Sequence, residues 1–226
     1  MKFLIGSQNF GFDTEDSDMD YVEFVYPDIH KLCCPIPKTK EVKGDDGHMV
    51  KVIDIRSLPS LFYKSNLDVL QLLFSKDASY SWLTKYFFMH EKELSTINLP
   101  RLYSSIMGSN KSRLKKGTPK DLAHVIFGYK TLINFHEQGF TDLRSCFEHS
   151  DRDIYLEIRS GKNHKKWLEY CSELELEALL KEMYYKEKLP NDEFMREFEQ
   201  DISVELVDTL HHNELYKDSL RKMYDI

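Results

Sequence analysis

The chain has 226 residues, a net charge of −7 and a hydrophobic content of 41%. This length fits one domain with a large core or two small domains. The negative charge excludes a protein that binds nucleic acid through its overall charge, although not one that uses a local basic patch. Its four cysteines form no Cys-x-x-Cys pair, so we expect a reduced, cytoplasmic protein without structural zinc. No stretch holds the roughly 20 apolar residues that span a bilayer, and the apolar run at the N-terminus is too short for a signal peptide. We therefore expect no membrane association.

The first 56 residues favour β-strands. Lys2–Ile5 is a short apolar run, and Tyr21–Tyr26 is rich in aromatic and β-branched residues. Met49–Ile55 has the composition of a further strand. The polar segment 38–48, with two glycines, predicts a hairpin or a mobile loop.

From Ser57 onward the apolar spacing becomes helical. We expect helices over residues 67–74, 80–90, 118–138, 162–188 and 192–223. The segment 108–117 is rich in lysine and arginine and is expected to be a basic loop, either solvated or in contact with triphosphate or RNA phosphates. These patterns predict an α+β fold, with a small α/β N-terminal part (1–108) followed by a mainly helical region (109–226). The long helices at the end could pack against a second copy as a homodimer.

Two carboxylates one residue apart stand out near the N-terminus. On a strand, Asp18 and Asp20 would project to the same face, and such a pair can hold a hard divalent cation such as Mg²⁺. Gly6-Ser7 just upstream offers backbone N–H groups and a hydroxyl to a phosphate. The alternative is a solvated acidic turn. Together, these residues predict a site for a metal-bound nucleoside triphosphate.

The spacing of Gly6-Ser7 and Asp18-Met19-Asp20-Tyr21 resembles the signature of the DNA polymerase beta-like nucleotidyltransferase superfamily. With Phe10-Gly11 and Ser17 included, the string is similar to the RlaP-type predicted nucleotidyltransferases of bacteria and phages.

Two downstream segments extend this resemblance. Asp54-Ile55-Arg56, leading into the leucine-rich stretch 64–75, resembles the strand and helix of that family. The segment 120–124 with the later Lys130 resembles a basic helix of the family. One position departs from the pattern. Gln71 stands where family members often carry Glu, so we assign it no catalytic role.

The resemblance implies a small mixed-sheet polymerase beta-like core that transfers NMP from an NTP to a hydroxyl and releases pyrophosphate, with Mg²⁺ or Mn²⁺ as cofactor. The implied catalytic metal ligands are Asp18, Asp20 and Asp54. The implied nucleotide-binding residues are Gly6, Ser7, Ser17, Lys120 and His124. The acceptor stays open between a protein side chain, an RNA end and a small molecule.

Several residues also have plainer interpretations. Asp54 could be a structural carboxylate paired with Arg56 or Lys51, and Lys120 with His124 could be an ordinary exposed helical pair. At the level of function, the rival is a protein that binds a nucleotide or a nucleotide signal without turnover, for instance in phage–host defence.

A second, unrelated motif is the Arg-x₄-His spacing of Arg144 and His149, which is similar to that of HEPN-type ribonucleases. Two residues at this spacing arise easily by chance, so the motif carries little weight beside the carboxylate pair.

Overall fold

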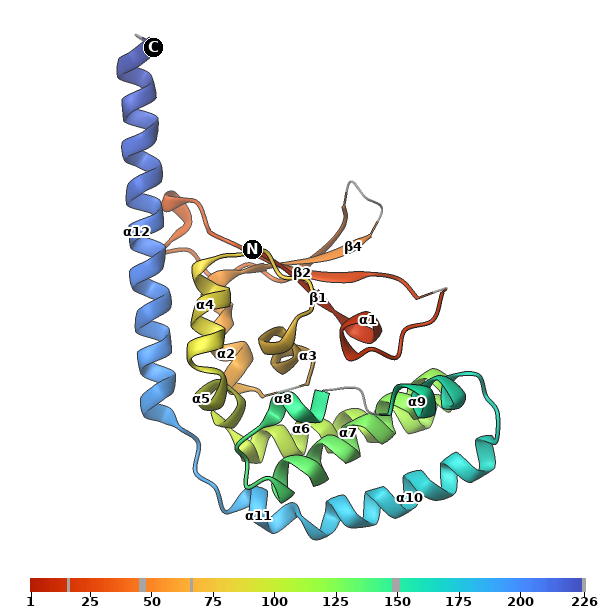
Figure 1. Ribbon diagram of the computed structural model, residues 1–226. Coiled ribbons are helices and arrows are strands. Elements are labelled where there is room, and N and C mark those ends of the chain that lie inside the picture. Colours follow the sequence, from red (N-terminus) through yellow and green to blue (C-terminus); the bar gives the residue numbers. More distant parts are fainter. Residues whose placement is uncertain (16, 45–47, 66, 148–150, 225–226) are drawn as a thin grey trace.

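The computed structural model describes residues 1–224 apart from 16, 45–47, 66 and 148–150, and describes side chains as far as residue 212. A small sheet near the N-terminus is followed by a mostly helical region, as the sequence predicts. Helices cover one face of the sheet, and a long C-terminal helix stands along its side (Figure 1). No helix among the described residues is long and apolar enough to cross a membrane.

The sheet has four strands in the order β1-β2-β4-β3. Their bounds are β1 Lys2–Ile5, β2 Asp20–Val25, β3 Lys40–Lys43 and β4 Met49–Asp54. The two outer pairings are antiparallel, and β3 with β4 forms the expected hairpin, whose tip at 45–47 lies outside the described residues. The central pair β2–β4 is parallel, with Asp20 opposite Met49 and Val25 opposite Asp54.

Twelve helices and three short 3₁₀ turns make up the other elements of the described chain. The helices are α1 Gly6–Phe10, α2 Leu58–Tyr63, α3 Leu67–Leu70, α4 Trp82–Met89, α5 Glu91–Thr96, α6 Leu99–Lys116, α7 Pro119–Glu137, α8 Leu143–Phe147, α9 Arg152–Arg159, α10 His164–Leu180, α11 Glu182–Lys186 and α12 Asp192–Tyr224. The 3₁₀ turns are η1 Ile29–Lys31, η2 Ile55–Ser57 and η3 Gln71–Phe74.

Helix α7 begins where the sequence predicts. The hydroxyl of Thr118 accepts a hydrogen bond from the backbone N–H of Asp121 at 3.1 Å, and Pro119 occupies the first helical position. The basic loop expected at 108–117 is wrong, because α6 continues through this segment to Lys116. Its buried side chains, Leu102, Ile106 and Asn110, recur every fourth residue and hold this helix against α7. The boundary expected after residue 108 therefore falls inside α6.

One hydrophobic core extends through both halves of the chain. It includes Phe3 and Phe24 on the helix-covered face of the sheet and continues through Phe62 of α2 to Phe198 of α12. The rings of Phe62 and Phe198 meet edge to face, with centroids 5.8 Å apart. The opposite face of the sheet carries a separate small cluster of Leu4, Tyr21 and Val50.

Candidate functional site

Asp20 is the first residue of β2 and faces the helices. Because side chains alternate along a strand, it shares its face with Val22 and Phe24, which belong to the main core. Asp18 is exposed and precedes the strand, so the two carboxylates are not carried by one strand as expected. They nevertheless interact, because the charge of Asp18 raises the pKa of Asp20.

The surroundings of Asp20 hold charges of both signs. Burial is the largest cause that raises the pKa of this carboxyl, followed by the negative charge of Asp18 and, more weakly, that of Glu41. The positive charges of Lys120 and Lys51 act in the opposite direction. A divalent cation here would compensate the repulsion between the two aspartates.

Gly6 touches Asp20 from the neighbouring strand end. Its φ of +75° favours glycine, and an added Cβ atom would lie 3.2 Å from Oδ2 of Asp20. The sequence predicts that the backbone N–H of Gly6 binds a phosphate. In the structure this N–H already donates to Oε1 of Gln71, at 2.8 Å. Ser7 is buried. The sequence predicts Gly6 and Ser7 at the site, but it does not predict the hydrogen bond between Gly6 and Gln71.

Gln71 is the residue at this site that sequence reasoning missed. It is buried, accepts from Gly6, and donates from Nε2 to the carbonyl of Asp68 at 3.2 Å. Two features of the sequence pointed to it: a polar amide inside a leucine-rich stretch, and a position where members of the resembled family often carry Glu. Its role is to fix the turn between β1 and α1 beside Asp20.

Asp54 does not lie with Asp18 and Asp20. The parallel register puts it opposite Val25, five residues along from Asp20, or roughly 16 Å at the rise of a strand. It also alternates onto the face of Val50 and Val52, away from Asp20. In Figure 1 the end of β4 points toward α12, whereas the start of β2 lies near α1.

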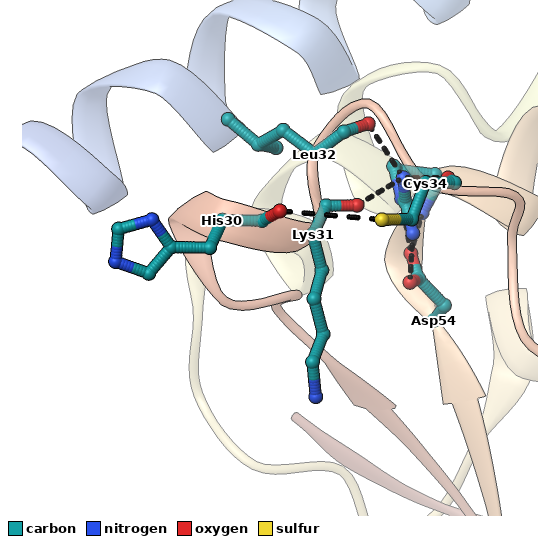
Figure 2. A network of polar contacts seen from close by, with 6 residues as sticks. His30, Lys31, Leu32, Cys34 and Asp54 are labelled. Carbon is teal, nitrogen blue, oxygen red and sulfur yellow. Dashed lines mark hydrogen bonds and ion pairs between the residues drawn. The ribbon is translucent and has the colours of Figure 1, made fainter.

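The carboxylate of Asp54 is fully engaged by Arg56. The guanidinium donates to both carboxylate oxygens, at 3.0 and 2.7 Å, and the backbone N–H of Arg56 adds a third bond. The same guanidinium donates to the carbonyls of Lys31, Leu32 and Cys34 (Figure 2). This arrangement matches the structural interpretation of Asp54, a carboxylate that ties the loop after β2 to the end of β4.

Lys120 and His124 share one face of α7 but differ in environment. Lys120 is exposed, whereas His124 packs edge-on against Phe12 and Phe10, with centroids 4.9 and 6.0 Å apart. Burial, together with the charges of Arg113 and Lys120, lowers the pKa of His124 to about 3. The imidazole is therefore neutral, and the pair is not the ordinary exposed pair of the plainer interpretation.

A cavity of about 190 Å³ opens beside this histidine. It lies between the end of α1, α3, α6 and α7, and its lining includes Phe10, Asp68, Ser109, Arg113 and His124. Helix α1 spans only five residues from Gly6 to Phe10, roughly 7 Å. The cavity thus begins about one short helix away from the Gly6 turn that touches Asp20, and both apolar and polar side chains line it.

Ser17 belongs to the loop that leads to Asp18. Its hydroxyl accepts from the backbone N–H of Thr14 at 2.9 Å and from a guanidinium nitrogen of Arg159 at 3.3 Å. Ser17 is therefore placed next to the carboxylate pair, with its hydroxyl already engaged in shaping the loop.

The donor set fits one hard cation. Mg²⁺ typically takes one or two carboxylates and completes its shell with water and substrate phosphates, as Asp18 and Asp20 would permit. No group of three His, Cys, Asp or Glu side chains that could hold a metal ion occurs within the described part of the chain. On β4, the residues that share the face of Asp20 nearest to it are Met49 and Lys51, neither of which is acidic.

The structure describes one of the two residues of the second motif. Arg144 is paired with Glu91 of α5, with Nε 3.2 Å from a carboxylate oxygen, and His149 lies outside the described residues.

Comparison with known protein families gives a match over the first part of the chain. The model of a family described as the RNA repair pathway DNA polymerase beta family, RlaP, matches residues 2–137. This range holds Gly6, the carboxylate pair, Gln71 and His124, and ends with α7. A comparison with curated proteins found no match.

Proposed function

Because the chain belongs to the RNA repair pathway DNA polymerase beta family, we propose that it is a Mg²⁺-dependent nucleotidyltransferase that moves NMP from an NTP to a hydroxyl and releases pyrophosphate. The observation that carries this proposal is the contact between Gly6 and Asp20, with Asp18 alongside. It joins the glycine turn to the carboxylate pair at one end of the sheet.

The proposed role of each residue follows from the charge of its side chain. Asp18 and Asp20 would hold Mg²⁺, which when bound supplies positive charge at the phosphates under attack. Lys51 and Lys120, whose charges already reach Asp20, would neutralise the charge that develops on the leaving pyrophosphate. Asp54 has no place in this proposed set, since Arg56 engages both of its carboxylate oxygens.

The cavity beside α1 is the proposed seat of the base and ribose. Phe10 provides an apolar wall, and Asp68, Ser109 and Arg113 supply polar groups at its rim. Small-molecule sites typically combine such a concave apolar wall with a few polar groups that fix orientation. His124, held neutral at the cavity, would contact the nucleotide without adding a charge.

An RNA end is the acceptor that the surface charge favours. A Cβ atom on Gly161 would lie 3.7 Å from Cγ of Pro119, which places the turn between α9 and α10 beside the start of α7. Exposed lysines gather along this basic edge at Lys111, Lys115, Lys116, Lys120, Lys162, Lys165 and Lys166. On a chain of net charge −7, such a local group can attract a phosphate backbone to the site.

The test is a transfer assay with each NTP labelled at the α-phosphate, with Mg²⁺ or Mn²⁺ and a mixture of RNAs with free 3′ hydroxyls. We expect label on RNA and release of pyrophosphate, both abolished by Asp20→Asn. Asp28→Asn is the matched control, because Asp28 lies at the other end of the sheet, where it caps η1. Transfer to protein instead of RNA would retain the enzyme and overturn the acceptor.

A nucleotide-binding protein without turnover is the second candidate. The displacement of Asp54 favours it, because two carboxylates suffice to bind a metal–nucleotide complex, whereas two-metal transfer usually uses more ligands. Metal-dependent NTP binding that never yields pyrophosphate with any acceptor would support this candidate over the enzyme.

A further inference from the structure

The loop between the glycine turn and the carboxylate pair is held from outside the family-matched range. Residues 11–17, of which 16 lies outside the described residues, connect α1 to Asp18, and α9 contacts them through Arg152, Tyr155 and Arg159. This helix begins 15 residues after the match ends at 137. Its contacts to the loop join residues 139 to 147 positions apart in the chain.

Two arginines of α9 reach the loop backbone. A guanidinium nitrogen of Arg152 donates to the carbonyl of Gly11 and to Oδ1 of Asp13, the latter at 3.0 Å. Arg159 donates from one nitrogen to the carbonyl of Phe12 and from the other to the hydroxyl of Ser17 at 3.3 Å. Together the two side chains contact both ends of the loop.

The same face of α9 also anchors the loop by packing. Residues 152, 155 and 159 lie on one helical face because they are three and four positions apart. The ring of Tyr155 meets that of Phe12 at a centroid distance of 5.2 Å, and both side chains are buried. Phe12 in turn stacks on Phe10, with the rings 5.6 Å apart and nearly parallel.

The start of the loop is also held by other elements, because the N–H of Phe12 donates to the carbonyl of Ser7 at 3.2 Å and its ring packs on His124 of α7. Beyond Phe12 the loop has fewer contacts. Its internal hydrogen bonds join Thr14 and Ser17 in a single turn. Within the described part of the chain, the hydrogen bond from Arg159 is what links the hydroxyl of Ser17 to another element, and Asp18 directly follows Ser17. A misplacement of about 1 Å in a reacting group can cost roughly 100-fold in rate.

We propose that Arg152 and Arg159 are positioning residues, and that α9 completes the nucleotidyl-transfer site by fixing loop 11–17 and with it the carboxylate Asp18. The inference about catalysis rests on the proposed function, whereas the inference about loop order does not. It assigns a role in the site to a helix beyond the part of the chain that the family model matches.

The experiment compares Arg159→Gln and Arg159→Lys with wild type and with Arg144→Gln. Arg144 lies away from the loop and is matched to Arg152, because each is paired with a carboxylate and their side chains are 43% and 44% exposed. For Arg159 it controls for the loss of a guanidinium elsewhere in the protein. Three quantities are measured: amide hydrogen exchange over residues 11–19, Mn²⁺ affinity by electron paramagnetic resonance, and the kcat and KM of transfer.

For Arg159→Gln we expect exchange at least about tenfold faster, confined to the loop, weaker Mn²⁺ binding, and a kcat lower by roughly 100-fold with a smaller change in KM. Lysine keeps the charge but not the forked guanidinium, so Arg159→Lys should restore part of the Mn²⁺ affinity and little of the loop protection. Arg144→Gln should leave all three quantities unchanged.

Unchanged loop exchange and unchanged Mn²⁺ affinity in Arg159→Gln would overturn the proposal. If that variant does not fold, Arg152→Gln is measured in the same way and decides by the same criteria. A wild-type protein that shows no transfer would count against the proposed function alone, because hydrogen exchange still reports whether α9 orders the loop.

Discussion

A Cβ atom on Gly6 would lie 3.2 Å from Oδ2 of Asp20, so a side chain at position 6 would force the carboxylate to move by a few tenths of an ångström. In Gly6→Ala, the left-handed backbone (φ +75°) costs about 1–2 kcal/mol, and the methyl group pushes Asp20 aside. We expect a lower thermal midpoint and weaker Mn²⁺ binding, measured by calorimetry and electron paramagnetic resonance. Gly139→Ala, also at positive φ but with no atom near its Cβ position, should lower stability alone. Equal Mn²⁺ affinity in the two variants would contradict the close approach.

Asp54→Asn should behave as a structural mutation. It leaves the largely buried Arg56 without its carboxylate, and breaking such a buried pair costs about 3 kcal/mol. We expect a clear loss of stability in urea unfolding but near-normal Mn²⁺ affinity in the folded fraction. Loss of Mn²⁺ binding without loss of stability would return Asp54 to the metal site.

Asp20→Asn should have the opposite effects, a loss of Mn²⁺ binding without a loss of stability. Folding raises the pKa of Asp20, so the folded state binds this proton more tightly than the unfolded state does. The ionised carboxylate therefore lowers stability at neutral pH, and this cost disappears as the pH falls below the pKa. We expect the metal-free variant to melt higher than wild type at pH 7 but to bind no Mn²⁺. A lower melting temperature would contradict the conclusion that the ionised carboxylate of Asp20 destabilises the folded protein.

His124 should make the protein sensitive to mild acid. Its pKa falls from 6.5 in the unfolded chain to about 3 in the folded protein, so below pH 6.5 only the unfolded state takes up the proton. The free energy of unfolding should then fall by up to about 1.4 kcal/mol per pH unit toward pH 3. Urea unfolding between pH 7 and 4 measures this slope. The slope should become shallower in His124→Gln, and an unchanged slope would exclude His124 as its source.

Filling the cavity should separate nucleotide binding from metal binding. Ser109 lines the cavity rim from α6, so Ser109→Trp would occupy the space proposed for the base. We expect NTP affinity to fall at least about tenfold, equal to 1.4 kcal/mol, with Mn²⁺ affinity retained. Ser112→Trp, also exposed on α6 but not among the lining residues, is the control. If both variants bind NTP normally, the base lies elsewhere.

The sequence predicts local structure well because local signals determine it. The strand at Tyr21–Tyr26 and the capped start at Thr118-Pro119 follow from residues that are neighbours in the chain, and the structure confirms both. The prediction of a basic loop at 108–117 is wrong because it gave the positive charges of this segment more weight than the helical spacing of its apolar residues. A positive last turn is in fact favourable for a helix, since it faces the negative end of the helix dipole.

The site is harder to predict because it depends on pairing. Flanking isoleucines suggest a strand carboxylate at Asp54, but only the parallel register reveals that it stands away from Asp20. Gln71 and Arg159 reach the site across 65 and 142 residues, with no sequence motif to connect them. Contacts between residues so far apart in the chain depend on how whole helices and strands pack together. No local pattern in a single sequence indicates that packing.

The packing of α12 also bears on how the chain folds as it is synthesised. Phe198 fills the space between Phe62 and Tyr86, and Glu205 accepts from Tyr26, whose hydroxyl also accepts from Trp82. Tyr26, Phe62, Trp82 and Tyr86 are synthesised more than 100 residues before Phe198 and Glu205. Until α12 is made, the nascent protein exposes aromatic surface, so the synthesis of this helix would control when the first strands become protected from aggregation or degradation.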